Sequence, residues 1–306
     1  MRGDSAAADS VLERLRETPA TSSSYYPVRV AEWGGDFRIA ERAARDQTRP
    51  GNRREARVAG FLNLAILFTA RGRWSDAYAE LANAARIDPV MALEERAVLA
   101  GLPFLPVPRE DLEGLRRDLD AWTPPAAPVG SPPERAYQRH ARCFLLGLVS
   151  SKLGDFETAL AFADSLERLP DAAGTTVPGD LAATVRASVA WRSGQAPDRV
   201  LRELSALEGH LPAALWQDPV FGQEQARFIR AASLLAAGSP EDALGWLQNT
   251  FTLTPGAVYY QAGVSYLEAQ ALDALSRPNE ARQARESLER LWAEADRGIE
   301  IPAPER

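Results

Sequence analysis

Cysteine, histidine and lysine are all scarce in this 306-residue chain, and the scarcity of the first two excludes particular kinds of site. The single cysteine, Cys143, excludes an internal disulfide framework. Two histidines and one cysteine are too few for a zinc site without carboxylates at a recognisable spacing. Lysine is almost absent, so arginine carries the positive charge. We therefore expect no disulfide-stapled fold, no metal centre and no cofactor.

Long hydrophobic runs and basic stretches are missing as well. The longest apolar stretch, Val58 to Ala70, contains Asn63, whereas a membrane span needs about 20 apolar residues. The N-terminus lacks the apolar core of a signal peptide. We therefore predict a cytoplasmic protein without membrane insertion; an extracytoplasmic location would require a transmembrane segment upstream of Met1. The net charge of -7, with no run of Lys and Arg, argues against nucleic acid as a partner.

What the chain does have is a short turn phrase that recurs along it. The copies are Gly3–Ala8, Gly35–Ala40, Gly72–Ala77, Gly154–Ala159 and Gly238–Ala243, with weaker copies at Gly194–Arg199 and Ser276–Ala281. Their last residues are separated by 32, 37, 82, 40, 44 and 38 positions. The separation of 82 is about twice the others, which indicates one further copy that the phrase does not mark. A period in this range is the signature of a helical solenoid.

The hydrophobic spacing on both sides of each turn is helical. Phe61 and Phe68 share one face before the turn at Gly72, and Ala77 and Leu81 share one face after it. Glycine ends the first helix because it adopts the left-handed conformation without steric cost. The Asp, Ser or Pro that follows suits the start of the second helix. The pattern predicts helix hairpins over residues 24–50, 53–88, 90–122, 132–169, 179–209, 218–253 and 257–297.

These residues resemble the tetratricopeptide repeat family. The second unit supplies that family's pattern of large apolar, small, aromatic, turn and proline positions in order and spacing: Phe61, Leu64, Ala65, Phe68, Gly72, Ala77, Leu81, Ala84 and Pro89. Looser matches surround Gly154 and Gly238, and the resemblance covers nearly the whole chain. It implies an all-α fold, a right-handed α-solenoid of about seven antiparallel helix hairpins.

Two proline-rich segments interrupt the repeats. Leu102–Pro108 replaces the glycine turn of the third hairpin with a crossing that cannot be helical. Residues 123–133 favour extended backbone and are predicted to form a hinge or linker. We therefore expect N-terminal hairpins over 1–122, this linker, C-terminal hairpins over 134–298 with a polar capping helix, and a tail over 299–306.

The first copy of the turn phrase, at Gly3, has no helix before it. A hairpin cannot bury its apolar face alone, so we expect the chain to begin within a repeat, as part of a longer protein. The incomplete first repeat also predicts an exposed apolar end that can self-associate.

A search for chemistry finds no catalytic constellation. His140 and Cys143 lie three positions apart on a predicted helix, but no third group is in place to orient them. Cys143 sits among Phe144, Leu145 and Leu146, where a cysteine packs as a small hydrophobe. We predict that the protein is not an enzyme.

In the repeat family, the first helices line a concave groove. Aligned by spacing, the groove positions here are Asn63, Ile66, Phe144, Leu148, Thr184, Ser188, Trp191, Gln225, Phe228, Tyr266 and Gln270. We predict a peptide-binding groove formed by Asn63, Phe144, Leu148, Ser188, Trp191, Phe228, Tyr266 and Gln270, with the four aromatic residues as anchors. The alternative is that these residues pack tightly inside a strongly wound superhelix.

The sequence thus favours a non-catalytic scaffold for protein–protein interaction, which binds a peptide or protein segment in the concave groove. An alternative hypothesis is the C-terminal regulatory or sensor region of a bacterial signalling protein, a Ser/Thr kinase or a transcription regulator. The unit from Tyr259 to Asp296 is similar to the closing repeat of such kinases, although the kinase motifs themselves are absent. A kinase or DNA-binding module encoded directly upstream of Met1 would favour this alternative.

Overall fold

The computed structural model describes residues 36–125, 136–171, 174–207, 209, 211, 215, 218–250 and 256–296. Within these ranges the chain forms thirteen helices and no strand, which confirms the all-α prediction. The helices are α3 (Phe37–Gln47), α4 (Arg54–Ala70), α5 (Trp74–Ala85), α6 (Pro89–Gly101), α7 (Arg109–Ala121), α9 (Gln138–Leu153), α10 (Phe156–Arg168), α11 (Val177–Arg192), α12 (Pro197–Ser205), α13 (Glu224–Ala236), α14 (Pro240–Thr250), α15 (Ala257–Ala274) and α16 (Pro278–Leu291). None of the described helices is both long and apolar enough to cross a membrane.

The turns between paired helices use the left-handed backbone that the recurring phrase predicts. Gly72, Gly154, Gly194 and Gly238 have φ values of 70°, 79°, 71° and 79°. Ser276, which replaces the glycine in a weaker copy of the phrase, is also left-handed, with a φ of 56°. The left-handed turn therefore occurs even where a side chain raises its conformational free energy.

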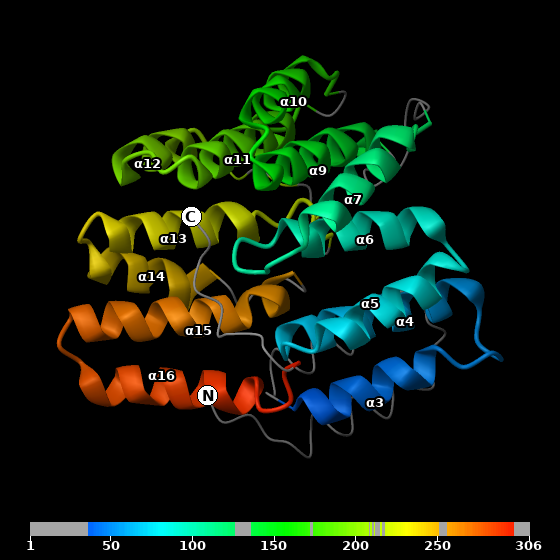
Figure 1. The fold of residues 1–306 in the computed structure, drawn as a ribbon, viewed down its shortest axis with the longest axis horizontal. Coiled ribbons are helices and arrows are strands. Elements are labelled where there is room, and N and C mark those ends of the chain that lie inside the picture. The colour runs from blue at the N-terminus through cyan, green and yellow to red at the C-terminus, as the bar shows by residue number, and fades with distance from the viewer. Residues whose placement is uncertain are drawn as a thin grey trace.

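Successive helices pair, and the pairs close into a ring. The first helices of the pairs contact one another in the series α4, α6, α9, α11, α13 and α15, and α15 then contacts α4. In Figure 1 the chain runs from α3 to α6 on the right, across the top from α9 to α12, and down the left from α13 to α16. The sequence predicted an exposed concave face. In the structure α15 instead lies against α4, so the series of helices closes on itself.

The first predicted hairpin is described only in part. Helix α3 packs against α4. The helix expected before it falls in residues 1–35, which lie outside the described ranges. The total of seven hairpins and self-association through this end therefore stay predictions.

The ring closes where the end of α16 meets the turn between α4 and α5. The indole nitrogen of Trp292 donates to the Ala70 carbonyl oxygen at 3.0 Å, and its ring meets that of Trp74 edge to face at 6.1 Å. The Asp296 carboxylate accepts from the Ser75 amide at 2.8 Å, in the first turn of α5. The C-terminal end thus caps a helix near the other end of the ring.

The connection between α6 and α7 passes through the interior of the ring. It is non-helical, as its prolines predict, and it carries Phe104 into contact with Phe228 and Tyr260, at centroid distances of 5.4 and 5.8 Å. From α9, Lys152 donates to the Leu102 carbonyl oxygen at 2.9 Å. This segment is therefore part of the core.

The predicted linker lies mostly outside the described residues, which resume at residue 136 after residue 125. Helices α6 and α7, which precede that gap, both contact α9, which follows it. The two predicted halves also meet at α4 and α15.

Candidate functional site

The residues predicted to line a binding groove are mostly buried. Asn63, Phe144, Leu148, Ser188, Trp191 and Phe228 are at most 7% exposed, while Tyr266 is half-buried and Gln270 is exposed. The closed ring and the segment before α13 cover these positions, so the structure differs from the exposed groove that the sequence predicted. Their role in peptide binding stays a prediction.

Part of the predicted groove nevertheless meets at one interior pocket. Phe144 and Leu148 from α9 line it together with Thr184 from α11 and Gln225 from α13. These are successive first helices, as the repeat alignment predicts. The pocket has a volume of about 30 Å³, which is room for about two water molecules.

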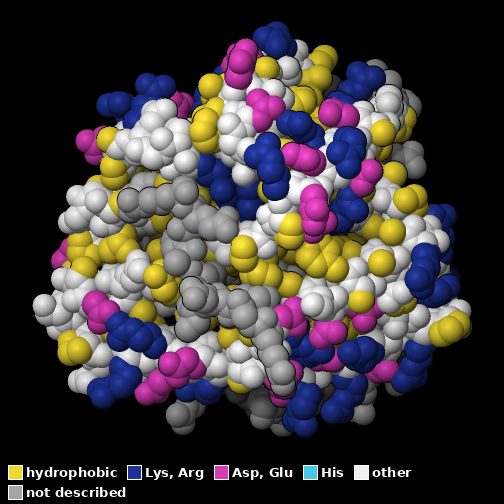
Figure 2. Space-filling view, viewed as in Figure 1, with side chains coloured by type: hydrophobic (Ala, Val, Ile, Leu, Met, Phe, Trp, Pro, Cys, Tyr) yellow, Lys and Arg dark blue, Asp and Glu magenta, His cyan; other side chains and the backbone are white. Residues whose placement is uncertain are grey.

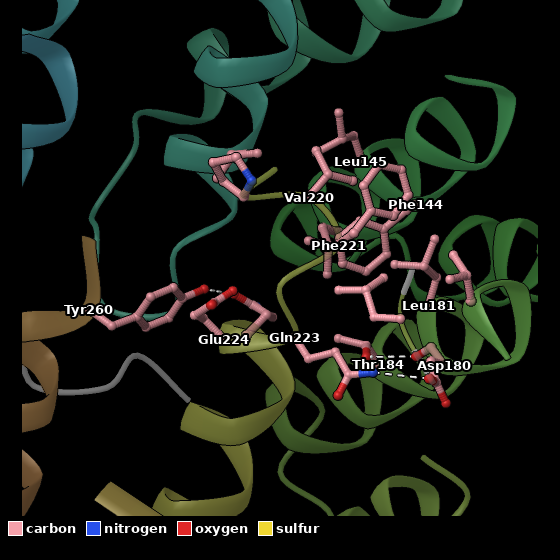
Figure 3. Close-up of a pocket in the computed structure, with 16 residues that line it drawn as sticks. Phe144, Leu145, Asp180, Leu181, Thr184, Val220, Phe221, Gln223, Glu224 and Tyr260 are labelled. Carbon is pink, nitrogen blue, oxygen red and sulfur yellow. Dashed lines mark hydrogen bonds between the residues drawn. The ribbon is translucent and has the colours of Figure 1, made fainter. Parts of the chain in front are cut away.

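The segment before α13 occupies the space that an open groove would offer. Val220 and Phe221 are 6% and 3% exposed and line the pocket beside Phe144 and Leu181, as Figure 3 shows. Sequence reasoning missed these residues because they precede a repeat helix. The only feature of the sequence that could have indicated them is that two apolar residues stand next to each other.

A buried carboxylate holds this segment against α11. Asp180 is 4% exposed, and one of its oxygens accepts from Thr176 Oγ1 at 2.9 Å, Gln223 Nε2 at 3.0 Å and the Gly209 amide at 3.1 Å. Gln223 has a left-handed φ of 63°, a conformation that costs free energy for a residue with a side chain. The hydrogen bond to Asp180 stabilises that conformation, so Asp180 has a structural task at the pocket.

The other polar end of the pocket is a chain of neutral groups. The Tyr260 hydroxyl donates to Gln225 Oε1 at 2.7 Å, and Gln225 Nε2 donates to the Gly101 carbonyl oxygen at 3.3 Å. Burial raises the pKa of Tyr260 well above its usual value, and the nearby charge of Glu224 adds to the shift. Tyr260 therefore remains a protonated donor at neutral pH.

Two adjacent glutamates on α6, the half-buried Glu94 and the buried Glu95, have raised pKa values. Glu95 is 4% exposed, and burial, followed by the charge of Asp218, raises the pKa of Glu95 to about 8. Burial and Asp218 likewise raise the pKa of Glu94 to about 8. Within the described residues, no three His, Cys, Asp or Glu side chains are arranged to hold a metal ion. A carboxyl pKa raised in the folded state predicts that stability falls as pH rises.

His140 and Cys143 lie on α9 and fit packing. His140 is 2% exposed, its ring lies 5.1 Å from that of Tyr137, and burial lowers the pKa of the imidazole. Cys143 is half-buried, and burial raises the pKa of its thiol. A thiol with a raised pKa is a poor nucleophile at neutral pH.

A larger groove lies on the surface between α5, α6 and α7, and we call it the α5–α7 groove. It consists of two cavities of about 360 and 280 Å³ that share Tyr78 and Arg96. In Figure 2 hydrophobic side chains gather between α5 and α6, and charged side chains border them. The groove is lined by Tyr78, Leu81, Ala82, Ala85, Pro89, Ala92, Leu93, Arg96, Ala100, Val107, Asp111, Leu115 and Asp118.

The floor of this groove is apolar and its polar groups are few. Leu81 and Leu115 are 3% and 2% exposed, and Leu93 is half-buried. Arg96 forms an ion pair with Asp118 across the groove. Sequence reasoning missed the site because three helices from two hairpins build it, and no repeat position marks it.

Comparison with known proteins returns no relative: no family model, no curated protein and no solved structure matches this chain. The resemblance to the tetratricopeptide repeat therefore stays a prediction.

Proposed function

We propose that this protein is a non-catalytic scaffold that binds a segment of another protein, and that the α5–α7 groove is the surface that receives it. One observation carries the proposal: the groove is open to solvent and apolar at its floor, with cavities of about 360 and 280 Å³. Grooves of this kind between helices bind amphipathic segments through apolar anchors.

The interior pocket supports the proposal less well. Its volume of about 30 Å³ excludes a peptide unless Val220 and Phe221 move away. The α5–α7 groove needs no such rearrangement, because its walls already stand apart. It also combines an aromatic side chain, Tyr78, with a small number of polar groups, which is the usual character of a binding site.

Two alanines on α5 provide a matched test of this surface. Ala79 and Ala82 are both exposed, but only Ala82 lines the groove. Ala82→Trp places an indole in the groove from an exposed position, and Ala79→Trp adds the same side chain at an exposed position on α5 that does not line the groove. Both variants should keep the circular dichroism spectrum and melting temperature of the parent protein.

The measurement is selection of short random peptides displayed on phage against the parent protein, followed by fluorescence anisotropy with the enriched peptides. We expect Ala82→Trp to weaken binding by more than about tenfold, the effect of blocking a central anchor. Ala79→Trp should bind as the parent does. Failure to enrich any peptide, or equal binding by both variants, would count against the proposal.

A further inference from the structure

We infer that the segment received by the α5–α7 groove is apolar and carries an arginine or lysine that pairs with Asp111. This inference rests on the proposed function and adds the chemistry of the partner. Its basis is the balance of charge around the groove, together with the position of Tyr78 between the two cavities.

Among the described residues that line the groove, the one cation is Arg96, and its charge is already neutralised. Arg96 is paired with Asp118, and that pair adds no net charge. Asp111 is exposed, lines the same groove, and forms no ion pair with any described residue. Its place in the first turn of α7 lets the helix dipole offset only part of its charge. The groove therefore presents a net negative charge to a partner.

Tyr78 lies where the two cavities meet, and it feels both charges. Burial raises the pKa of its hydroxyl, the negative charge of Asp111 raises it further, and Arg96 opposes the shift. The hydroxyl forms no hydrogen bond with a described residue. A cation that approaches Asp111 from solvent would thus enter the cavity that Tyr78 also lines, where the hydroxyl oxygen can accept a hydrogen bond.

The other residues that line the groove are mostly apolar, and they indicate that the rest of the partner segment is apolar as well. Ala82 and Ala85 on α5 and Pro89 on α6 are exposed and offer no hydrogen-bonding side chain, and Leu93, one turn after Pro89, is half-buried. A polar segment laid against this surface would lose its hydration without compensation. An apolar segment gains from burial, and a single cation at the Asp111 end fixes its register.

The test uses the same phage-displayed peptides and two charge variants of neighbouring residues. Asp111→Lys reverses the charge in the groove, whereas Glu110→Lys makes the same change on an exposed side chain that does not line it. We expect the enriched peptides to be apolar with an Arg or Lys. Asp111→Lys should weaken their binding by about fivefold or more, as expected for loss of an exposed ion pair followed by repulsion. Glu110→Lys should weaken the binding of the same peptides by less than half the factor seen for Asp111→Lys.

A synthetic peptide completes the experiment. Replacing its basic residue by Gln should weaken binding to the parent protein by about the same factor, but should leave binding to Asp111→Lys unchanged or improved. Enriched peptides that lack a basic residue, or that bind Asp111→Lys as tightly as the parent, would overturn the inference. If Ala82→Trp still blocked such peptides, the proposed function would stand while this inference failed; if no peptide were enriched, both would fail.

Discussion

The contact between Trp74 and Trp292 predicts an energetic coupling between the two ends of the ring. Trp292 is 8% exposed and Trp74 is 7% exposed, and their rings meet edge to face at 6.1 Å. Each change to alanine should destabilise the fold by about 3–5 kcal/mol, since it removes a buried indole. The double variant should lose about 0.5–1.5 kcal/mol less than the sum of the single losses, which is the worth of a direct aromatic pair.

Changes to phenylalanine separate the hydrogen bond from the packing. The indole nitrogen of Trp292 donates to the Ala70 carbonyl oxygen, whereas that of Trp74 has no hydrogen-bond partner among the described residues. Trp292→Phe should therefore cost about 1 kcal/mol more than Trp74→Phe, because it leaves the Ala70 oxygen unpaired.

The assay is urea denaturation followed by circular dichroism at the helical band. Trp191 serves as the control partner for Trp292, since it packs in a separate cluster with Val200 and Ile229. The losses for that pair should add within about 0.5 kcal/mol. Ring closure also predicts one cooperative transition, because each described hairpin from α4 and α5 to α15 and α16 has two neighbours, whereas the end of an open solenoid frays. A coupling between Trp74 and Trp292 no larger than that of the control pair would refute the closed ring.

Three further predictions concern single residues. A Cβ at Gly263 would lie 2.7 Å from Phe104, so Gly263→Ala should lower the free energy of unfolding by about 1–3 kcal/mol and lower the melting temperature. An unchanged melting temperature would contradict the close packing of Phe104 against Gly263. Ser276→Gly should stabilise the fold by about 0.5–1 kcal/mol because it relieves a left-handed serine, and Ser276→Ala should give no gain in the same denaturation measurement. The pKa of Glu95, raised from 4.5 to about 8, means that the folded state holds a proton that the unfolded state releases. Stability should therefore fall as pH rises from about 5 to 8, by at most about 1.4 kcal/mol per pH unit for one group. Glu95→Gln should reduce this slope in melting curves; parallel curves for variant and parent would show that Glu95 does not titrate in this way.

Local chemistry made the helices and their turns predictable from the sequence. The left-handed backbone at Gly72 and Gly154 follows from the lack of a side chain, whatever the rest of the chain does. Asp36 and Asp155 accept hydrogen bonds from amides three residues ahead, at 3.0 and 3.3 Å, and so begin α3 and α10. Such interactions span a few residues, and the recurring phrase contains all the atoms that they need.

The ring, and with it the candidate site, was decided by the tertiary structure alone. Whether Trp292 reaches Trp74 depends on how all the hairpins between them pack against one another. Contacts between distant segments also bury Phe144, beside Val220 and Phe221, and Phe228, against Phe104, whereas a repeat alignment would place both on a free surface. An all-helical chain with its turns and caps thus follows from the order of the residues, because these features depend on neighbours along the chain. Which face is covered, and that the half-buried Tyr78 lines a groove, depended on contacts between distant hairpins that no local pattern encodes.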